Sequence, residues 1–329
     1  MRQASIIMLI ELLSFIAAGI LFGVFTGITP GIHINLVAVV LLSASPFLLA
    51  HFSVLSVACF IVSMSITHTF LNFIPSAFLG APEESTALAV LPAHNLLLRG
   101  MAYEAVRFSS AGSIVALIIV ACSSPLLLAA VPAVFSAIKD YMGWLLLAIT
   151  AFMILKSGRW DRIFWSAFVF LLAGAFGMTV FSLNIKDPLF PMLSGMFGVS
   201  MLLTSIFQKA AIPKQRVTEM VRVKKRSFLK AAFAGSASGG LTTIFPGLGP
   251  AQAAIIASQF TGKMGIYSYI ILIGGIDTAS MMMSLITLFS IEKARNGAIV
   301  AVQKLTGGIG CLLYTSPSPR DRTRSRMPS

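Results

Sequence analysis

The chain has 329 residues, of which 57% are hydrophobic and 11% charged, and its mean hydropathy is +0.91. A soluble domain has about half apolar and a quarter charged residues, so lipid must be the solvent for much of this surface. Twenty-four Lys and Arg against 11 Asp and Glu give a net charge of +13. The basic residues stand mostly between apolar runs, which is typical of membrane topology, and we therefore expect no nucleic-acid partner.

Apolar runs alternate with short polar segments along almost the whole chain. They cover residues 6–25, 34–50, 54–73, 114–134, 144–155, 163–181, 189–207, 228–245 and 266–288. A transmembrane helix needs roughly 20 apolar residues, or fewer with tilt or help from flanking side chains. The pattern predicts an all-α polytopic membrane protein with about eight to ten transmembrane helices.

Residues 75–98 form a different kind of segment. Three Pro and the adjacent pair Glu83 and Glu84 interrupt apolar sequence in and around this stretch. Irregular backbone at membrane depth is tolerated only where it is buried in protein or lines a wet cavity. We therefore expect a broken or re-entrant element here.

Basic residues concentrate in two segments. Residues 209–230 contain eight Lys and Arg and one Glu, and residues 156–162 form the next strongest cluster. Both segments are expected on the cytoplasmic side, since two spans separate them. Binding of anionic lipid or of a partner is the alternative role for the basic loop 209–230.

An internal repeat is visible in the glycine pattern. Residues 18–34 and 234–250 align without gaps. The alignment pairs Gly19 with Gly235, Gly23 with Gly239, Pro30 with Pro246 and Gly31 with Gly247. We expect a first transmembrane repeat over 1–208 and a second, truncated repeat over 231–310, joined by the basic loop. The repeats are inverted if 75–98 is re-entrant, which we favour, and parallel if it crosses the membrane.

The Pro-Gly pairs predict paired helix breaks. Proline removes a backbone donor and glycine permits positive φ, so each helix must end or unwind there. The next helix then begins with unpaired N–H groups that suit a carboxylate, and freed carbonyls suit Na⁺. A kink without ligand is the alternative. The residues expected to bind substrate are Thr29, Pro30, Gly31, Asn35, Pro75, Ser76, Ser85, Thr86, Pro246, Gly247 and Gly249.

Asp277 stands in the middle of an apolar run, where an ionisable side chain faces the protein interior or a wet pathway. We expect Asp277, Thr278 and Asn72 to bind the coupling ion, Na⁺ or a proton. A hydrogen-bonded structural role for Asp277 is the alternative. Each histidine, taken alone, is interpreted as a satisfied polar residue rather than a proton relay.

No Walker loop, HExxH, GxSxG or zinc-type Cys and His spacing occurs. We therefore expect no enzyme activity, no metal centre and no cofactor beyond the coupling ion. A membrane channel or a lipid-handling protein remains the alternative to a carrier, because both can also use broken helices.

The last segment, 311–329, changes abruptly to Ser, Pro and Arg. Its CLLYTSPSPRD looks like the translation of a sequencing-library adapter, and we leave it out of fold reasoning. On this interpretation the C-terminal portion of the natural protein is missing.

Three motifs together resemble one family. GVFTGITPGI at 23–32 and IFPGLGPA at 244–251 are similar to a repeated GxxPG signature, and residues 75–106 are similar to a further family stretch. Over residues 1–310 the chain resembles the large membrane subunit of tripartite tricarboxylate transporters, in an archaeal-like short form. The resemblance implies a multi-pass permease of a prokaryotic plasma membrane that takes up di- or tricarboxylates with an ion gradient. It also implies a small membrane subunit and an extracytoplasmic solute-binding protein as partners.

Overall fold

The computed structural model describes residues 2–79, 85–156, 158–183, 203, 213–217, 221–245, 248–262 and 264–307. Every element in these ranges is a helix. The chain divides into two units, one made of Met1–Ser136 with Pro213–Ser329 and the other of Ala137–Ile212.

In the larger unit, the first helix pair joins α1 (Arg2–Ile28) to α4 (Val54–Leu71), which pack extensively on each other. Gly23 permits this approach, since a Cβ there would lie 2.5 Å from the Met64 carbonyl oxygen. Between them lie α2 (Ile34–Ser43) and α3 (Ser45–His51), bent by 70° to one another. The chain turns from α1 into α2 at Gly31, which has a φ of 89°.

A second helix pair follows later in the sequence. The helix α12 (Lys225–Ile244) packs extensively on α14 (Ile266–Ile291), with α13 (Pro250–Thr261) between them in the chain. Gly239 approaches α14 as Gly23 approaches α4: its added Cβ would lie 2.5 Å from the Ile276 carbonyl oxygen. The glycine pattern of the sequence therefore marks a close helix contact in both pairs.

The segment after α4 is broken into short helices. It contains α5 (Phe73–Leu79), the 3-10 turn η1 (Ala87–Ala89) and α6 (Val90–Leu98), before the long helix α7 (Ala102–Ile138) begins. The expected interruption within 75–98 is thus observed. Pro82, Glu83 and Glu84 lie outside the described residues.

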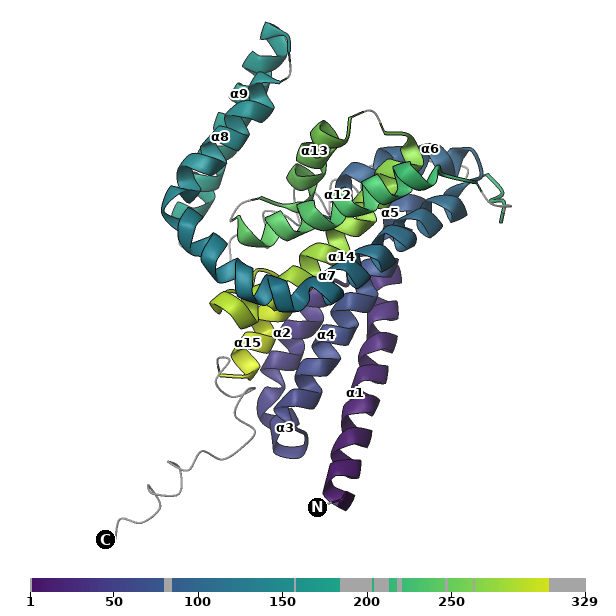
Figure 1. Cartoon of the computed structure of the whole chain (residues 1–329), viewed down its shortest axis with the longest axis vertical. Helices are drawn as coiled ribbons and strands as arrows, with labels where there is room; N and C mark the ends of the chain where they lie inside the picture. Colours follow the sequence, from purple (N-terminus) through teal and green to yellow (C-terminus); the bar gives the residue numbers. More distant parts are fainter. Residues whose placement is uncertain are drawn as a thin grey trace. The chain divides into compact units, whose positions relative to one another are not determined.

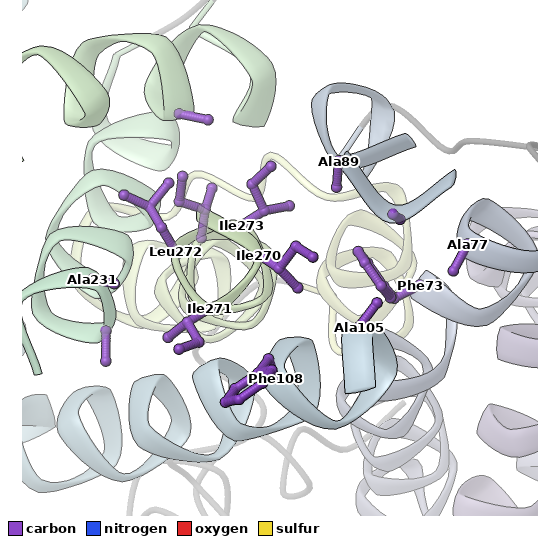
Figure 2. Close-up of a cluster of buried hydrophobic side chains, with 14 of the residues drawn as sticks. Phe73, Ala77, Ala89, Ala105, Phe108, Ala231, Ile270, Ile271, Leu272 and Ile273 are labelled. Atoms are coloured by element: carbon purple, nitrogen blue, oxygen red, sulfur yellow. The ribbon is translucent and has the colours of Figure 1, made fainter. Parts of the chain in front are cut away.

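The centre of the larger unit is α14, which is buried along most of its length. Figure 2 shows Ile270, Ile271, Leu272 and Ile273 surrounded by side chains from several other helices. Ala231 comes from α12, Phe108 and Ala105 from α7, and Phe73 from α5. Because α14 is apolar on all its faces, it occupies the core of the unit. Its few polar side chains, such as Asp277, are therefore candidates for a functional site.

Short helices that follow each helix pair in the chain pack against elements of the other pair. The N-terminal half of the larger unit contains α1 to α7, and its C-terminal half contains α12 to α15. The helix α15 (Gly297–Leu305) packs on α2 and α4, where Ile299 and Val302 are buried against Ile34 and Ala38. In the same way η1 contacts α13 and α6 contacts α14, and Ala89 and Ala93 share one buried cluster with Ala253 and Ala254. The two parts of the larger unit are therefore interlocked, and α2 and α15 lie next to each other (Figure 1).

The smaller unit contains η2 (Lys139–Tyr141), α8 (Met142–Leu155) and α9 (Trp160–Ser182), of which α8 and α9 contact each other (Figure 1). Large apolar side chains on these helices are exposed, among them Trp144, Phe164 and Leu171. No residue of α9 is buried. Such a surface suits lipid, where exposed apolar side chains carry no hydrophobic cost.

Five described helical stretches are long and apolar enough to cross a membrane, and six if the bent pair α2 and α3 forms one span. They are Ile6–Ile28, Val54–Leu79, Ala102–Leu155, Trp160–Ser182 and Ile266–Ile291. The expected runs 114–134 and 144–155 both fall within one helical stretch, and the run 189–207 lies outside the described residues. The predicted eight to ten spans are not confirmed.

The basic loop differs from its predicted boundary. The helix α12 begins at Lys225 rather than after residue 230, because Lys and Arg are good helix formers and Lys225, Arg226 and Lys230 extend its first turns. The described part of the loop contacts the turn before α7: the Gln215 side chain accepts a hydrogen bond from Ala102 N and donates to Leu97 O.

Candidate functional site

A cavity of about 390 Å³ lies within the larger unit, where α2, α4, α12, α13, α14 and α15 meet. Polar side chains and helix ends dominate its wall. The lining residues are His33, Ile34, Asn35, His68, Thr69, Asn72, Ser85, Thr242, Thr243, Leu248, Gly249, Pro250, Gln252, Asp277, Ser280, Met281, Ser284, Arg295, Asn296 and Gly297. Its size suits a small organic molecule.

One side of the cavity carries oxygen ligands around Asp277. Asn72 Nδ2 donates to Asp277 Oδ2 at 2.8 Å and to Ser85 Oγ at 3.4 Å. Thr69 and Thr278 join α4 to α14 through their hydroxyls at 3.0 Å. A carboxylate with amide and hydroxyl oxygens nearby is a donor set that suits a hard cation. The structure therefore brings two of the expected ion-coupling residues, Asn72 and Asp277, into direct contact.

Arg295 gives the cavity wall a positive charge. It follows α14, and its guanidinium donates to the Ile244 carbonyl at 3.2 Å, while its backbone N–H donates to Ser284 Oγ at 3.3 Å. Burial lowers the pKa of Arg295, but an arginine pKa starts so high that the side chain stays charged. Among the described lining residues, Arg295 is the one Lys or Arg and Asp277 the one carboxylate.

Three helices begin at this cavity. The starts of α2, α13 and α15 contribute His33 and Asn35, Gly249 and Pro250, and Asn296 and Gly297 to its wall. The first N–H groups of a helix lack intrahelical partners, and the dipole places partial positive charge there. Gly249, the N-cap of α13, has no side chain to cap these donors. Such a convergence of helix starts with an arginine favours an anion.

Asn35 connects two of these helices. Its Oδ1 accepts from Ala298 N at 3.0 Å, which is also capped by Asn296 Oδ1 at 2.9 Å. A Cβ on Gly297 would lie 2.8 Å from Asn35 Cγ, so this contact leaves no room for a larger residue. Asn35 thus helps to hold the start of α15 at the cavity wall.

Two histidines lie side by side in the wall. The rings of His33 and His68 meet edge to face with centroids 5.3 Å apart. His68 is 1% exposed, and its Nδ1 lies 3.1 Å from Thr26 Oγ1. His33 is the N-cap of α2, and its Nδ1 accepts from Asn35 N at 3.1 Å. Both rings are held in place by these contacts.

Five of the residues expected from the sequence line the cavity: Asn35, Asn72, Ser85, Gly249 and Asp277. The others in the described ranges lie outside its wall, namely Thr29, Pro30, Gly31, Pro75, Ser76, Thr86 and Thr278. Ser76 and Thr86 instead bond to each other at 2.6 Å and support the turn next to Ser85. Pro246 and Gly247 fall outside the described residues, between α12 and α13.

Sequence reasoning missed several wall residues, above all Arg295, His33 and Gln252. Buried Gln252 Oε1 makes no hydrogen bond within the described structure. A signal existed for His33, which stands two positions after the Gly of the first Pro-Gly pair.

No group of three or more His, Cys, Asp or Glu side chains that could hold a metal ion is found among the described residues. The wall offers instead one carboxylate with neutral oxygens, and one arginine with helix starts. This arrangement can hold an anion and a monovalent cation in one cavity.

Comparison with known proteins gives a match over nearly the whole chain. Residues 13–313 match the Tripartite tricarboxylate transporter TctA family. The chain is a member of the TctA family. An uncharacterized protein of Methanocaldococcus jannaschii, MJ1079, is 30% identical over 303 residues, which cover 90% of this chain and 74% of that protein. No solved structure matches the chain.

TctA membership confirms the resemblance drawn from the three motifs, and the archaeal relative fits an archaeal-like short form. It implies the membrane subunit of a tricarboxylate transporter, in agreement with a multi-pass membrane protein that is not an enzyme. A tripartite transporter also involves a binding protein and a small membrane subunit.

Proposed function

We propose that this chain is a permease that carries a di- or tricarboxylate across a prokaryotic plasma membrane, coupled to a Na⁺ or proton gradient. The substrate occupies the 390 Å³ cavity of the larger unit. The observation that carries the proposal is the meeting of three helix starts and Arg295 at that cavity.

The positive charge of the cavity wall supports binding of an anionic substrate. A carboxylate in the cavity meets the Arg295 guanidinium, which offers paired donors in a fixed plane. The N–H groups at Gly249 and Gly297 lie at helix starts, where negative charge is stabilised by roughly 0.3–1 kcal/mol or more each. A second carboxylate of the same molecule then has donors of its own, so the site suits a multiply charged anion.

The carboxylate of Asp277 supports binding of a coupling cation in the same cavity. An ionised carboxylate in the interior of a membrane protein needs a compensating charge or hydrogen bonds, and Asn72 supplies one bond. We propose that Asp277, Asn72 and Thr278 hold the coupling-cation side of the cavity, with Thr278 acting through Thr69. Entry of the anion alone would leave excess negative charge, so anion and cation bind together. One charge moving across 100 mV yields about 2.3 kcal/mol for uptake.

Two repeats would give this site its alternating access. We propose that the pair α1 and α4 and the pair α12 and α14 belong to inverted repeats, which is supported by matched glycine contacts in both pairs. Residues just after each Pro-Gly pair, His33 in the first half and Gly249 in the second, line the cavity, which supports a binding site between two repeats. The basic loop 209–230 would lie on the cytoplasmic side, and a small membrane subunit and a binding protein would deliver the substrate.

Transport by the purified chain in liposomes tests this function. We expect saturable uptake of labelled succinate or citrate that rises when a Na⁺ or proton gradient is imposed. Equilibrium binding of the same labelled acids to the protein in detergent provides a second readout that needs no partner subunit. The proposal is overturned if neither acid binds and no uptake occurs under any imposed gradient, with or without a small subunit and binding protein.

A further inference from the structure

We propose that a surface beside the start of α7 binds the headgroup of an anionic phospholipid. This basic surface combines exposed side chains of the turn between α6 and α7 with exposed side chains of the basic loop. Its residues are Leu98, Arg99, Tyr103, Lys214, Arg216 and Val217. None of them lines the cavity, so the inference does not rest on the proposed transport of a carboxylate.

Hydrogen bonds to the backbone hold the two parts of the basic surface together. The Arg216 N–H donates to the Gly100 carbonyl at 2.8 Å. The Gln215 side chain accepts from Ala102 N at 3.0 Å and donates to Leu97 O at 3.1 Å. These contacts use the backbone and one uncharged amide. The loop is therefore fixed on the turn without using any of its positive charges.

The positive charges of this surface have no acidic partner in the described part of the chain. The ion pairs found there join Arg107 to Glu104 and Arg159 to Asp161, and neither includes Arg99, Lys214 or Arg216. Three cations on one fixed surface repel each other and attract an anion. A phosphate suits them, because a guanidinium offers paired donors to its oxygens.

The basic loop continues along α7 with further positive charge. The Arg107 guanidinium donates to the Val221 carbonyl at 3.3 Å and so joins this part of the loop to α7. The helix α12 then begins with Lys224 as its N-cap, and Lys225 and Arg226 stand in a first turn that contains no acidic residue. All three side chains are exposed. Cations at a helix start add to the positive end of the dipole, so the whole loop attracts negative charge.

Three exposed apolar or aromatic side chains favour a lipid over a free phosphate. Val217 is 81% exposed, Leu98 53% and Tyr103 44%. In the bilayer interface such side chains contact acyl chains instead of water, and tyrosine is enriched there. Clusters of Lys and Arg at the cytoplasmic membrane surface attract anionic lipids. The basic surface therefore offers cations to the headgroup and apolar contacts to the chains of the same molecule.

Binding of defined lipids to the purified full chain in a non-ionic detergent tests this site. Labelled phosphatidylglycerol is titrated onto the protein, and labelled phosphatidylcholine is the zwitterionic comparison. We expect phosphatidylglycerol to bind at least about tenfold more tightly, since each nearby basic residue contributes on the order of fivefold. This preference should shrink in about 0.5 M salt, which screens exposed charges. Free glycerol phosphate, which has no acyl chains, should not displace the lipid.

Two triple variants assign the preference to the basic surface. The test variant combines Arg99→Gln, Lys214→Gln and Arg216→Gln. The control variant combines Lys139→Gln, Lys293→Gln and Lys304→Gln, three exposed lysines elsewhere in the chain. Both remove three charges. We expect the test variant to bind the two lipids with similar affinity and the control variant to keep the preference of wild type.

A single variant tests whether the loop must be fixed on the turn. Gln215→Ala keeps every charge but removes the two hydrogen bonds to Ala102 and Leu97. A loosened loop pays more entropy to gather its cations around one headgroup. We therefore expect phosphatidylglycerol to bind severalfold more weakly to Gln215→Ala than to wild type. This variant also provides a readout if the triple variant does not fold.

Four results would each overturn the lipid site. They are equal affinity of wild type for the two lipids, equal loss of preference in the two triple variants, displacement of the lipid by glycerol phosphate, and unchanged lipid affinity in Gln215→Ala. Succinate binding should be unchanged in every variant, because none of the substituted residues lines the cavity. Failure of the permease proposal and failure of the lipid site are therefore separate results.

Discussion

Asp277 and Arg295 give the cavity opposite charges, on side chains that the sequence separates by the second half of α14 and the link after it. Each residue is restrained by a named neighbour, Asn72 for the carboxylate and the Ile244 carbonyl for the guanidinium. A cavity with balanced charge can admit an anion and a cation together without a net change. At the scale of residues, we propose this balance as the basis of coupling.

Replacement of Asp277 tests the coupling. In Asp277→Asn we expect carboxylate binding to be retained or strengthened, because a negative charge near the anion is removed, while stimulation of uptake by an imposed gradient falls about tenfold or more. The measurement is the ratio of initial uptake rates with and without the gradient. Asp161→Asn is the control, since Asp161 is exposed and pairs with Arg159 in the smaller unit. An unchanged ratio in Asp277→Asn would remove Asp277 from the coupling site.

At the residue scale, the sequence predicts the acidic side of the site better than the basic side. Asp277 is conspicuous because it interrupts an apolar run, and Asn72 stands one turn after His68. Arg295 stands in a polar link, where an arginine is ordinary and indicates nothing. Its place at the cavity depends on how the link returns over Ser284, which local sequence does not specify.

At the scale of elements, the pairs α1 with α4 and α12 with α14 make the most extensive contacts among the described helices of the larger unit. Gly23 faces the Met64 carbonyl in one pair and Gly239 faces the Ile276 carbonyl in the other. Small residues allow such approach in a membrane, where association depends on packing rather than on the hydrophobic effect. In the sequence, each of these close contacts lies seven residues before the proline of a Pro-Gly pair.

A methyl group at the close contact should destabilise the fold. Gly239→Ala places a Cβ 2.5 Å from the Ile276 carbonyl oxygen and 2.7 Å from Ala279 Cβ, and we expect a loss of about 1–3 kcal/mol in unfolding free energy. The neighbouring Gly240→Ala is the matched control, because its nearest contact is Met283 Cγ at an ordinary 3.7 Å. Thermal unfolding in detergent measures both. Equal melting temperatures for the two variants would contradict the packing role of Gly239.

The elements themselves are only partly predictable. Apolar runs predict α1, α4, α9 and α14 because length and composition suffice for a helix in lipid. The pattern fails at α7, which continues through Pro125 and Pro132 as one helix. It also fails at the start of α12, where basic residues taken as loop form helical turns. In both cases packing and helix propensity outweigh the local signal, which is proline in α7 and a cluster of charged residues in α12.

At the scale of the whole molecule, the larger unit is closed by elements that cross between its halves. The helix α15 packs on α2, η1 contacts α13, and α6 contacts α14. Asn35 bonds to Ala298 across 263 positions of sequence. No local sequence pattern predicts such contacts, since they depend on how the N-terminal and C-terminal halves of the larger unit pack on each other. They explain why residues of both halves are needed to build one cavity.

Truncation tests this interlocking. Removal of residues 296–329 takes away α15 and the wall residues Asn296 and Gly297, and it uncovers Ile34 and Ala38. We expect this variant to lose its single peak in size-exclusion chromatography and to melt at a lower temperature. Removal of 311–329 alone, the segment expected to be adapter-derived, should leave both properties unchanged. If the two truncations behave alike, α15 does not hold the halves together.

The central claim is that the cavity binds an organic anion through Arg295, and one binding measurement tests it most directly. Labelled succinate or citrate is titrated onto the purified chain in detergent, for wild type, Arg295→Gln and Lys293→Gln. Lys293 lies two positions away, is exposed and stacks on Phe135 outside the cavity wall, so its variant removes the same charge from the chain. We predict that Arg295→Gln weakens binding by at least about tenfold, as expected for loss of a charge-assisted contact, while Lys293→Gln binds as wild type. Equal affinity of all three proteins would contradict the account.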